Sequence, residues 1–490
     1  MFEAAELGRK VGKQAFAKAE PGIHTGLLEL QRTLRESRRR VVIVVSGVEG
    51  AGKGEVVNLL NRWLDARGIQ THAFWDESED ERMRPFYWRF WRALPPRGTI
   101  AILFGSWYTR PIIDRVFGRI GEDAFEAALH RITEFEQLLA DDGAVIVKFW
   151  FHLTKKAQQK RLKEEGSIKG KGAPPLKKFA RHYGDFRTVS ARALRVTDTG
   201  PSPWFVIEAE DRRHRDLSVG RTLLEILRQR LAPAPEVAAD GPPSSAPAPA
   251  QGAATVLDRV DLGRKLSPRA YEKKLDALQS DLYKLAWKAR NRQRNTVIVF
   301  EGWDAAGKGG AIRRLTAAMD ARLFRVISVA APTDEEKAQH YLWRFWRHVP
   351  RAGYVTIYDR SWYGRVLVER VEGFAREHEW QRAYQEINDF EEQLANHGVV
   401  MCKFWLHISA EEQLRRFKER ESIEWKQHKI TAEDWRNREK WGAYEAAVND
   451  MVARTSTDYA PWTLVSGNDK RNARIEVLAT LCEALEKALD

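Results

Sequence analysis

The sequence TVIVFEGWDAAGKGG, at residues 296–310, joins a short apolar run to a glycine-rich loop that carries Lys308. Glycines allow a tight bend in which successive backbone N–H groups point inward, where they can bind phosphate oxygens. A helix that begins after the loop would add its positive N-terminal end, and Lys308 would add a full charge. The order of strand, loop and helix therefore predicts a phosphate-binding loop (P-loop) in an α/β fold.

The chain contains this pattern twice. Residues 41–55 read VVIVVSGVEGAGKGE, and an offset of 255 residues separates Gly47 from Gly302 and Lys53 from Lys308. The same offset relates Trp91 to Trp346, Trp107 to Trp362 and Trp150 to Trp405. The sequence thus predicts a tandem repeat, and the two copies can be compared position by position.

Composition places the boundaries of the two copies. Residues 233–254 are rich in Pro, Ala, Gly and Ser without a hydrophobic period, which is typical of an exposed linker. We therefore predict domains at 1–232 and 255–490, joined by this linker. A chain of 490 residues is long enough for two such domains.

The second copy alternates short apolar runs with helical patterns. Each run is apolar on both faces, which favours a parallel five-stranded sheet with helices on both faces in each domain. The first copy repeats this order from 41 to 227. The predicted strands are 296–300, 326–329, 355–358, 399–406 and 463–465, and the predicted helices are 309–319, 334–348, 379–396, 410–421, 432–453 and 470–488.

The net charge of +13 is unevenly distributed. Residues 1–232 contain 41 basic and 30 acidic residues, a net charge of +11, whereas the part after the linker has +4. A basic surface favours a polyanionic partner such as nucleic acid, an anionic membrane or a phosphate chain, although a solvated basic face without a ligand remains an alternative. Two cysteines, no signal peptide and no apolar membrane span predict a cytoplasmic protein.

The P-loop departs from the usual pattern in one respect. Gly309 follows Lys308, at the position where Ser or Thr commonly supplies a hydroxyl to Mg²⁺. The candidate replacements are Asp304, inside the loop, and Asp359, which ends the predicted strand at 355–358. We therefore predict a Mg²⁺ site at these two carboxylates, although Asp359 could instead cap the next segment.

Five motifs follow one another in the second copy: FEGWDAAGKGGAIRRL at 300–315, YLWRFWRHVP at 341–350, YDRSWYGRVLVERV at 358–371, EEQLRRFKER at 411–420 and STDYAPW at 456–462. These motifs and their order resemble the polyphosphate kinase 2 family, and the resemblance spans nearly all of residues 265–490. The tandem arrangement resembles the family's two-domain class, whose members transfer the terminal phosphoryl group of inorganic polyphosphate to AMP and form ADP.

The resemblance implies a P-loop kinase-like fold with a helical lid, and it implies roles for particular residues. Residue type alone would also allow the arginines to be ordinary surface charges. The implied catalytic residues are Asp304, Lys308, Asp359, Arg360 and Arg420, with Asp304 and Asp359 holding Mg²⁺. The implied phosphate or nucleotide contacts are Gly302, Gly307, Gly309, Gly310, Arg365, Arg416 and Lys426.

The aromatic motif at 341–350 could suggest a base-stacking platform. Trp343, Trp346 and Val349 fall at helical spacing, however, which favours a packed helix face over a nucleic-acid surface. We therefore predict no nucleic-acid partner and no membrane partner. A homo-oligomer remains possible.

The first copy keeps the P-loop lysine as Lys53 but has lost other charged groups. Glu49 replaces Asp304, Phe104 replaces Asp359, Gly105 replaces Arg360 and Glu165 replaces Arg420. Since Phe104 cannot bind a metal ion, we predict that residues 1–232 do not catalyse phosphoryl transfer. They could hold the polyanion, with Lys169, Lys171, Lys177 and Lys178 as candidates, or serve as a structural partner of the active copy.

Three alternatives remain open at this stage. A polyphosphate-dependent nucleoside diphosphate kinase and an ATP-dependent nucleotide kinase would use the same fold. A non-catalytic polyanion-binding or nucleic-acid-binding protein would explain the charge but not the paired carboxylates Asp304 and Asp359. The sequence does not determine the acceptor nucleotide or the physiological direction of the reaction.

Overall fold

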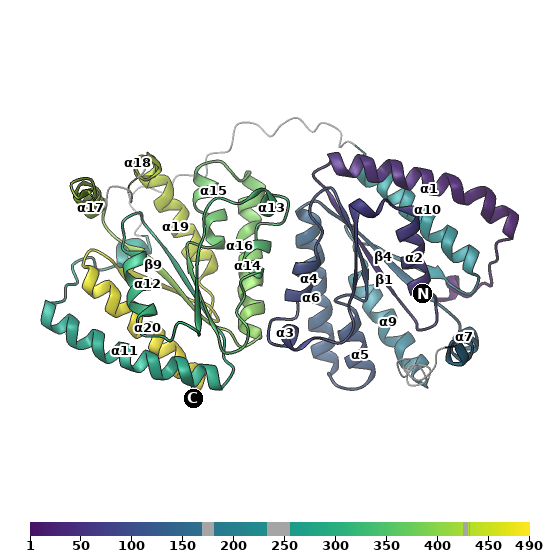
Figure 1. Ribbon diagram of the computed structural model, residues 1–490, viewed down its shortest axis with the longest axis horizontal. Helices are drawn as coiled ribbons and strands as arrows, with labels where there is room; N and C mark the ends of the chain where they lie inside the picture. The colour runs from purple at the N-terminus through teal and green to yellow at the C-terminus, as the bar shows by residue number, and fades with distance from the viewer. Residues whose placement is uncertain (169–180, 233–254, 425–429, 431) are drawn as a thin grey trace. The chain divides into compact units, whose positions relative to one another are not determined.

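The computed structural model describes residues 1–168, 181–232, 255–424, 430 and 432–490. The chain divides into two compact units. One consists of Met1–Glu77, Arg89–Val237 and Asp334–His340, and the other of Ser78–Trp88, Ala238–Thr333 and Tyr341–Asp490. Each unit contains one sheet with helices on both sides (Figure 1).

Both sheets have five strands in the same order, and every strand pair is parallel. The order is β2-β3-β1-β4-β5 in the first copy and, at matching positions, β7-β8-β6-β9-β10 in the second. This confirms the predicted tandem α/β fold. The strands are β1 (Arg40–Gly47), β2 (Ile69–Ala73), β3 (Ile100–Phe104), β4 (Ala144–His152), β5 (Trp204–Glu208), β6 (Thr296–Gly302), β7 (Phe324–Ser328), β8 (Val355–Asp359), β9 (Val400–His407) and β10 (Trp462–Ser466).

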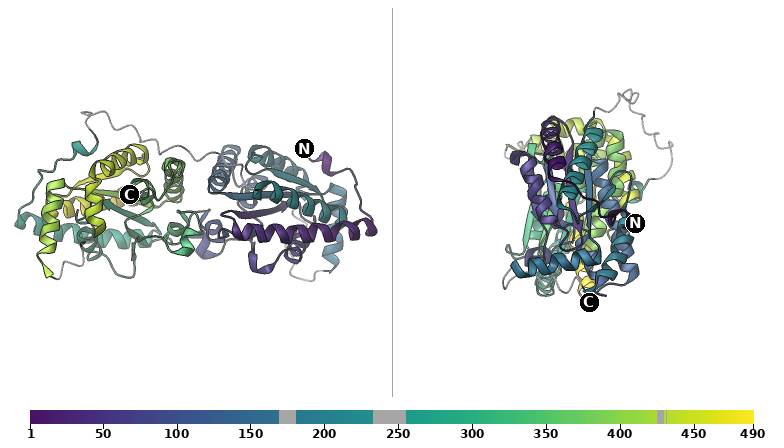
Figure 2. Two further views of the ribbon diagram at one scale, coloured as in Figure 1. Left: turned by 90° about the horizontal axis from the view of Figure 1, so that it is seen from above. Right: turned by 90° about the vertical axis from the view of Figure 1, so that its right-hand side faces the viewer.

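The helices of the first copy form two layers. On one face of the sheet α1 packs along α10 (Figure 1 and Figure 2), and α2 packs on β1. On the other face α6 packs on β4 and against α9. The longer helices are α1 (Lys13–Glu36), α2 (Lys53–Trp63), α5 (Thr109–Val116), α6 (Glu122–Asp141), α7 (Lys155–Ile168), α9 (Tyr183–Thr197) and α10 (Arg212–Leu231), and the short ones are α3 (Glu79–Arg82) and α4 (Trp88–Ala93).

The second copy repeats this arrangement, with α11 packed along α20. None of the helices in the described part of the chain is long and apolar enough to cross a bilayer. The helices are α11 (Pro268–Asn291), α12 (Lys308–Thr316), α13 (Asp334–Lys337), α14 (Trp343–Trp346), α15 (Val368–Val371), α16 (Glu377–Asn396), α17 (Ala410–Glu421), α18 (Ala432–Glu439), α19 (Trp441–Thr455) and α20 (Lys470–Leu489).

Three helix predictions were wrong in detail. The single helix expected at 334–348 is two short helices, α13 and α14, and the helix expected at 432–453 is divided at Lys440 into α18 and α19. The prediction also omitted α11. Most of its residues are polar or charged, and its few buried residues form a narrow apolar stripe that packs on α20. The predicted packing of Trp346 is confirmed, because its buried ring meets Phe390 edge to face.

A buried polar network explains the Trp and Tyr of the Ser-Trp-Tyr motif in both copies. In the second copy Trp362 and Tyr363 donate hydrogen bonds to Glu391, at 3.0 and 2.7 Å. Lys403 donates to the same carboxylate at 2.6 Å and to the carbonyl of Thr455 at 2.7 Å. The first copy forms the same set with Trp107, Tyr108, Glu136, Lys148 and Thr197. The motif therefore stabilises the fold, since a buried charge needs its partners.

Candidate active site

The P-loop of the second copy connects β6 to α12. Gly307 has φ of 114° directly before Lys308, the first residue of the helix. Gly302 has φ of 144°, and a Cβ there would lie 2.5 Å from the carbonyl oxygen of Leu406. Gly302 is thus required by the close approach of the loop to β9, as Gly47 is by its approach to Phe151 in the first copy.

The loop forms one wall of a cleft of about 840 Å³. Two carboxylates of the predicted metal site, Asp304 and Asp359, line the same cleft. Glu419, Glu433 and Asp434 also line it, so among the described residues five acidic side chains face seven basic ones and the lining has a net positive charge. A cleft of this size and net charge can hold a polyanionic substrate. Its basic lining residues are Lys308, Arg313, Arg360, Arg416, Arg420, Lys470 and Arg474.

Lys308 turns back across its own loop. Its ammonium group donates hydrogen bonds to the carbonyl oxygens of Gly302, at 2.6 Å, and Trp303, at 3.3 Å. Within the described ranges it forms no ion pair with a carboxylate. Its charge is therefore available to an anion that enters the cleft.

The register of the sheet brings Asp359 to the loop. Asp359 pairs with Phe300 across β8 and β6, two residues before Gly302. Arg360 follows immediately, and its Nη2 lies 3.3 Å from Oδ1 of Asp304. The amide of Asn437, on α18, donates a hydrogen bond to the other oxygen of Asp304 at 3.0 Å. The ends of β6 and β8 thus present two carboxylates and one guanidinium to the same space.

Glu301 is a third acidic residue at this edge that the sequence prediction omitted. It is buried at the end of β6 and accepts a hydrogen bond from the Ser361 hydroxyl at 2.8 Å. Burial raises the pKa of its carboxyl above the ordinary value. The sequence held one signal for Glu301. It lies directly before Gly302 of the P-loop, and the first copy, which has lost other charged groups, has Ser46 at the matching position.

Two residues that line the cleft of the second copy have unfavourable backbone conformations. Ala305 has φ of 61° and Arg360 has φ of 65°, in the left-handed region that non-glycine residues rarely occupy. The matching residues of the first copy are Gly50, with φ of 80°, and Gly105, with φ of 78°. Glycine gives the first copy the same backbone shape without strain. The second copy has the strained conformation and, with it, the Arg360 side chain.

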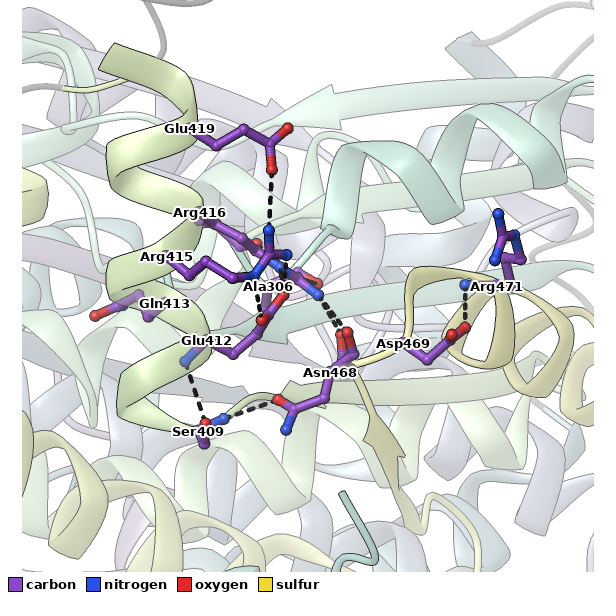
Figure 3. A network of polar contacts seen from close by, with 12 residues as sticks. Ala306, Ser409, Glu412, Gln413, Arg415, Arg416, Glu419, Asn468, Asp469 and Arg471 are labelled. Carbon is purple, nitrogen blue, oxygen red and sulfur yellow. Dashed lines mark hydrogen bonds and ion pairs between the residues drawn. The ribbon is translucent and has the colours of Figure 1, made fainter. Parts of the chain in front are cut away.

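Arg416, predicted to contact phosphate or nucleotide, has all five N–H donors occupied by protein groups. It donates to the carbonyl oxygens of Ala305 and Ala306 in the P-loop, each at 2.9 Å. It also donates to Gly467 and Asn468, and to the Glu412 carboxylate at 2.6 Å (Figure 3). A guanidinium offers five donors, so Arg416 connects α17 to the P-loop rather than leaving a donor for a ligand.

The first copy supports this interpretation of Arg416. Arg161 occupies the matching position and donates to the carbonyl oxygens of Ala209 and Glu210. From α9 and α19 onward the offset between the copies is 258 residues, so these two residues match Gly467 and Asn468. The arginine is thus present in the copy that has lost the carboxylate Asp359. A structural connection explains its presence in both copies.

The remaining basic residues differ in their relation to the cleft. Arg420, on α17, lines the cleft as expected. Arg365 is not among the described residues that line it; its guanidinium pairs with Glu369 at 2.9 Å and lies over the ring of Tyr341. Arg313, Lys470 and Arg474 line the cleft without having been predicted, because a single basic side chain on a helix carries no distinctive sequence pattern. The following predicted residues lie outside the described ranges: Lys169, Lys171, Lys177, Lys178 and Lys426.

The donor set at the cleft is compatible with Mg²⁺. Among the described residues no group of three or more His, Cys, Asp or Glu side chains could hold a metal ion by itself. Mg²⁺ characteristically uses one or two carboxylates, keeps several waters and takes further oxygens from substrate phosphates. Asp304 and Asp359 could supply this smaller protein contribution.

In the first copy the corresponding groups pair with each other. Lys53 lies 2.8 Å from the carboxylate of Glu49, which replaces Asp304. Arg215 is fully buried against the loop, and a Cβ on Gly52 would lie 1.8 Å from its guanidinium. Its charge is compensated by Glu55 and Asp216, each at 2.8 Å. The matching residue of the second copy is Ala473, which leaves the cleft open.

Comparison with known proteins gives one consistent result. The family model described as polyphosphate kinase 2 matches residues 10–234 and 265–490. A polyphosphate:AMP phosphotransferase of Pseudomonas aeruginosa is 49% identical over 493 residues, which cover 100% of this chain and 99% of the relative. Enzymes of the same name from Pseudomonas syringae pv. tomato and Acinetobacter johnsonii are 46% and 38% identical, with coverage of 100% and 96% of this chain and 99% and 97% of the relatives.

The fold comparison agrees with the sequence comparison. A crystal structure of a polyphosphate kinase 2 from Pseudomonas aeruginosa PA01 superimposes with a TM-score of 0.89 at 48% sequence identity. The match covers 100% of this chain and 99% of that chain. The similarity therefore extends over both copies.

Proposed function

We infer that this chain, which belongs to the polyphosphate kinase 2 family, transfers the terminal phosphoryl group of inorganic polyphosphate to AMP and forms ADP. The observation that carries this inference is the cleft of the second copy, where the P-loop lysine, the carboxylates of Asp304 and Asp359 and several arginines line one space. Three relatives of nearly full length carry the name of this activity.

Phosphoryl transfer requires positioning and positive charge more than covalent chemistry. Lys308 and the loop N–H groups would hold the phosphate that is transferred. Arg360 and Arg420 would stabilise the negative charge that spreads over the transferring group. The acceptor phosphate of AMP is already an anion, so no strong base is required, although Asp304 could orient that phosphate.

We propose that Asp304 and Asp359 hold Mg²⁺. When bound there, Mg²⁺ would supply positive charge that offsets part of the negative charge of the substrate phosphates. Arg360 pairs with Asp304, and Asn437 holds the other oxygen of this carboxylate, so the side chain is oriented before a ligand arrives. Arg416 is a positioning residue in this scheme, because it acts on the P-loop through hydrogen bonds.

We assign catalysis to residues 255–490. In the first copy Lys53 is paired with Glu49, Arg215 is packed against Gly52, and Phe104 replaces the second carboxylate. These changes remove the metal site and the free positive charge of the loop. We further propose that the protein acts in the cytoplasm, since both cysteines, Cys402 and Cys482, are buried free thiols.

The direct test is ADP formation from AMP and polyphosphate by the full chain, with and without Mg²⁺. ATP in place of polyphosphate tests the nucleotide kinase alternative, and ADP in place of AMP tests the diphosphate kinase alternative. Asp359→Asn supplies the blank, and we expect it to lower the rate by about 10²-fold or more because a metal ligand is lost. Equal turnover with ATP as donor, or an unaffected Asp359→Asn variant, would refute the proposal.

A further inference from the structure

The first copy contains a cavity of about 170 Å³ at the place that corresponds to the second-copy cleft. Its lining is largely aromatic and aliphatic. Seven aromatic side chains of the described residues line it, namely Phe74, Trp75, Phe104, Tyr108, Trp150, Tyr183 and Phe186. For comparison, an engineered cavity of about 150 Å³ in another protein binds benzene, so this cavity has room for one planar ring system.

The cavity arises from specific replacements between the copies. In the second copy Trp303 stacks on Trp441, with ring centroids 3.7 Å apart and planes 9° apart, and its edge meets Trp405. The first copy has Val48 in place of Trp303 and Tyr183 in place of Trp441. The large ring that fills this space in the second copy is therefore missing, and both replacement residues line the cavity.

Three buried polar atoms in the cavity wall have no hydrogen-bond partner among the described residues. They are the indole N–H of Trp150, the hydroxyl of Ser190 and the side-chain oxygen of Gln158. The three side chains are at most 5% exposed. Ser190 occupies the position of Val448 in the second copy. Since an aliphatic side chain packs there in the second copy, packing alone does not require a hydroxyl group at this position. The indole N–H of Trp405, at the matching position of the second copy, also has no partner among the described residues, so only Ser190 and Gln158 distinguish the cavity. Because an unpaired buried polar group costs free energy, these two atoms indicate a ligand that can donate and accept hydrogen bonds.

The charges around the cavity exclude a phosphate group. The carboxylate of Glu49, itself part of the lining, holds Lys53 at 2.8 Å, and Arg215 is compensated by Glu55 and Asp216. An anionic ligand would meet Glu49 and no unpaired cation of the loop. A neutral molecule would not be repelled by Glu49 and would not need a cation to compensate its burial.

We propose that the first copy binds a neutral, planar heteroaromatic molecule of about the size of a purine base in this cavity. The ring would lie among the aromatic side chains, donate a hydrogen bond to the side-chain oxygen of Gln158 and exchange one with the hydroxyl of Ser190. The proposal is independent of catalysis in the second copy.

Adenine is a suitable probe, and isothermal titration calorimetry of the full chain measures its binding. Titration in saturating AMP separates this site from the acceptor site of the second copy. Val48→Trp restores the ring of the second copy, and we expect it to weaken adenine binding at least tenfold. Ser190→Ala removes one hydrogen bond and should weaken binding about fivefold. Val448→Ala, the mirror change in the second copy, should leave it unchanged.

Several results would overturn the proposal. They are the absence of adenine binding at millimolar concentration, binding that Val48→Trp leaves intact, and toluene binding as tightly as adenine with no effect of Ser190→Ala. Val48→Leu provides a smaller filling side chain if the tryptophan variant does not fold. ADP formation is assayed on the same samples, so a failure of adenine binding is distinguished from a failure of the proposed phosphotransfer.

Discussion

The guanidinium of Arg360 lies 3.3 Å from the carboxylate of Asp304, and this pair joins the ends of two adjacent strands across the P-loop cleft. Asp304 follows β6, and Arg360 follows β8. Arg360 holds this position with φ of 65°, whereas Gly105 has the same backbone shape in the first copy. The strain at Arg360 is thus kept in the copy to which we assign catalysis.

Arg360→Gly should separate activity from stability. Glycine adopts positive φ readily, so the substitution relieves a backbone strain of about 1–2 kcal/mol. This gain offsets the loss of the ion pair and the greater conformational entropy of the unfolded chain. We expect the melting temperature to change little while ADP formation falls by about 10²-fold or more, because the charge that faces the transferring group is lost. Arg360→Lys, which keeps the charge, should retain more activity. A large drop in melting temperature with activity preserved would assign Arg360 a structural role instead.

Arg416→Lys tests the proposed positioning role. Lysine keeps the charge but cannot reproduce the planar set of hydrogen bonds to Ala305, Ala306, Gly467 and Asn468. We expect loss of stability on the order of 3 kcal/mol together with reduced kcat, because the three donors of a lysine cannot serve the five acceptors of Arg416 and buried carbonyl oxygens lose their partners. The matched change Arg161→Lys should destabilise the first copy and leave kcat nearly unchanged. A rise in KM alone, at unchanged stability, would indicate direct contact with substrate.

His407 should make the stability of the second copy depend on pH. Burial lowers the pKa of this imidazole to about 4, partly opposed by Asp258, and its Nδ1 accepts a hydrogen bond from Trp303 at 3.0 Å. The ordinary value is about 6.5, so the unfolded chain binds more protons between these two pH values. Stability should therefore fall as pH decreases from about 6.5 to 4.

Thermal unfolding of His407→Gln checks this expectation, because glutamine keeps an acceptor for Trp303 and does not titrate. The melting temperature of the wild-type chain should fall more than that of the variant over this pH range. Parallel curves for the two proteins would show that His407 is not the responsible group.

The sequence was sufficient to predict the tandem sheets and the P-loop, because apolar strands and the glycine-lysine loop are local patterns. It was not sufficient for residues whose position depends on packing. Glu301 reaches the site edge because β6 ends beside β8, and Arg474 reaches the cleft because α20 packs against α12. Arg416 has the residue type of a phosphate ligand, and only its five protein partners show that its donors are occupied.

The two P-loop lysines offer a direct test of where catalysis takes place, because Lys308→Ala and Lys53→Ala are the same change at matching positions of one chain. The measurement is ADP formation from AMP and polyphosphate by each full-length variant under identical conditions. We expect Lys308→Ala to lower the rate by about 10²-fold or more, whereas Lys53→Ala, which removes a lysine already paired with Glu49, should change it by about twofold or less. A comparable loss in both variants, or a larger loss for Lys53→Ala, would contradict the assignment of catalysis to the second copy.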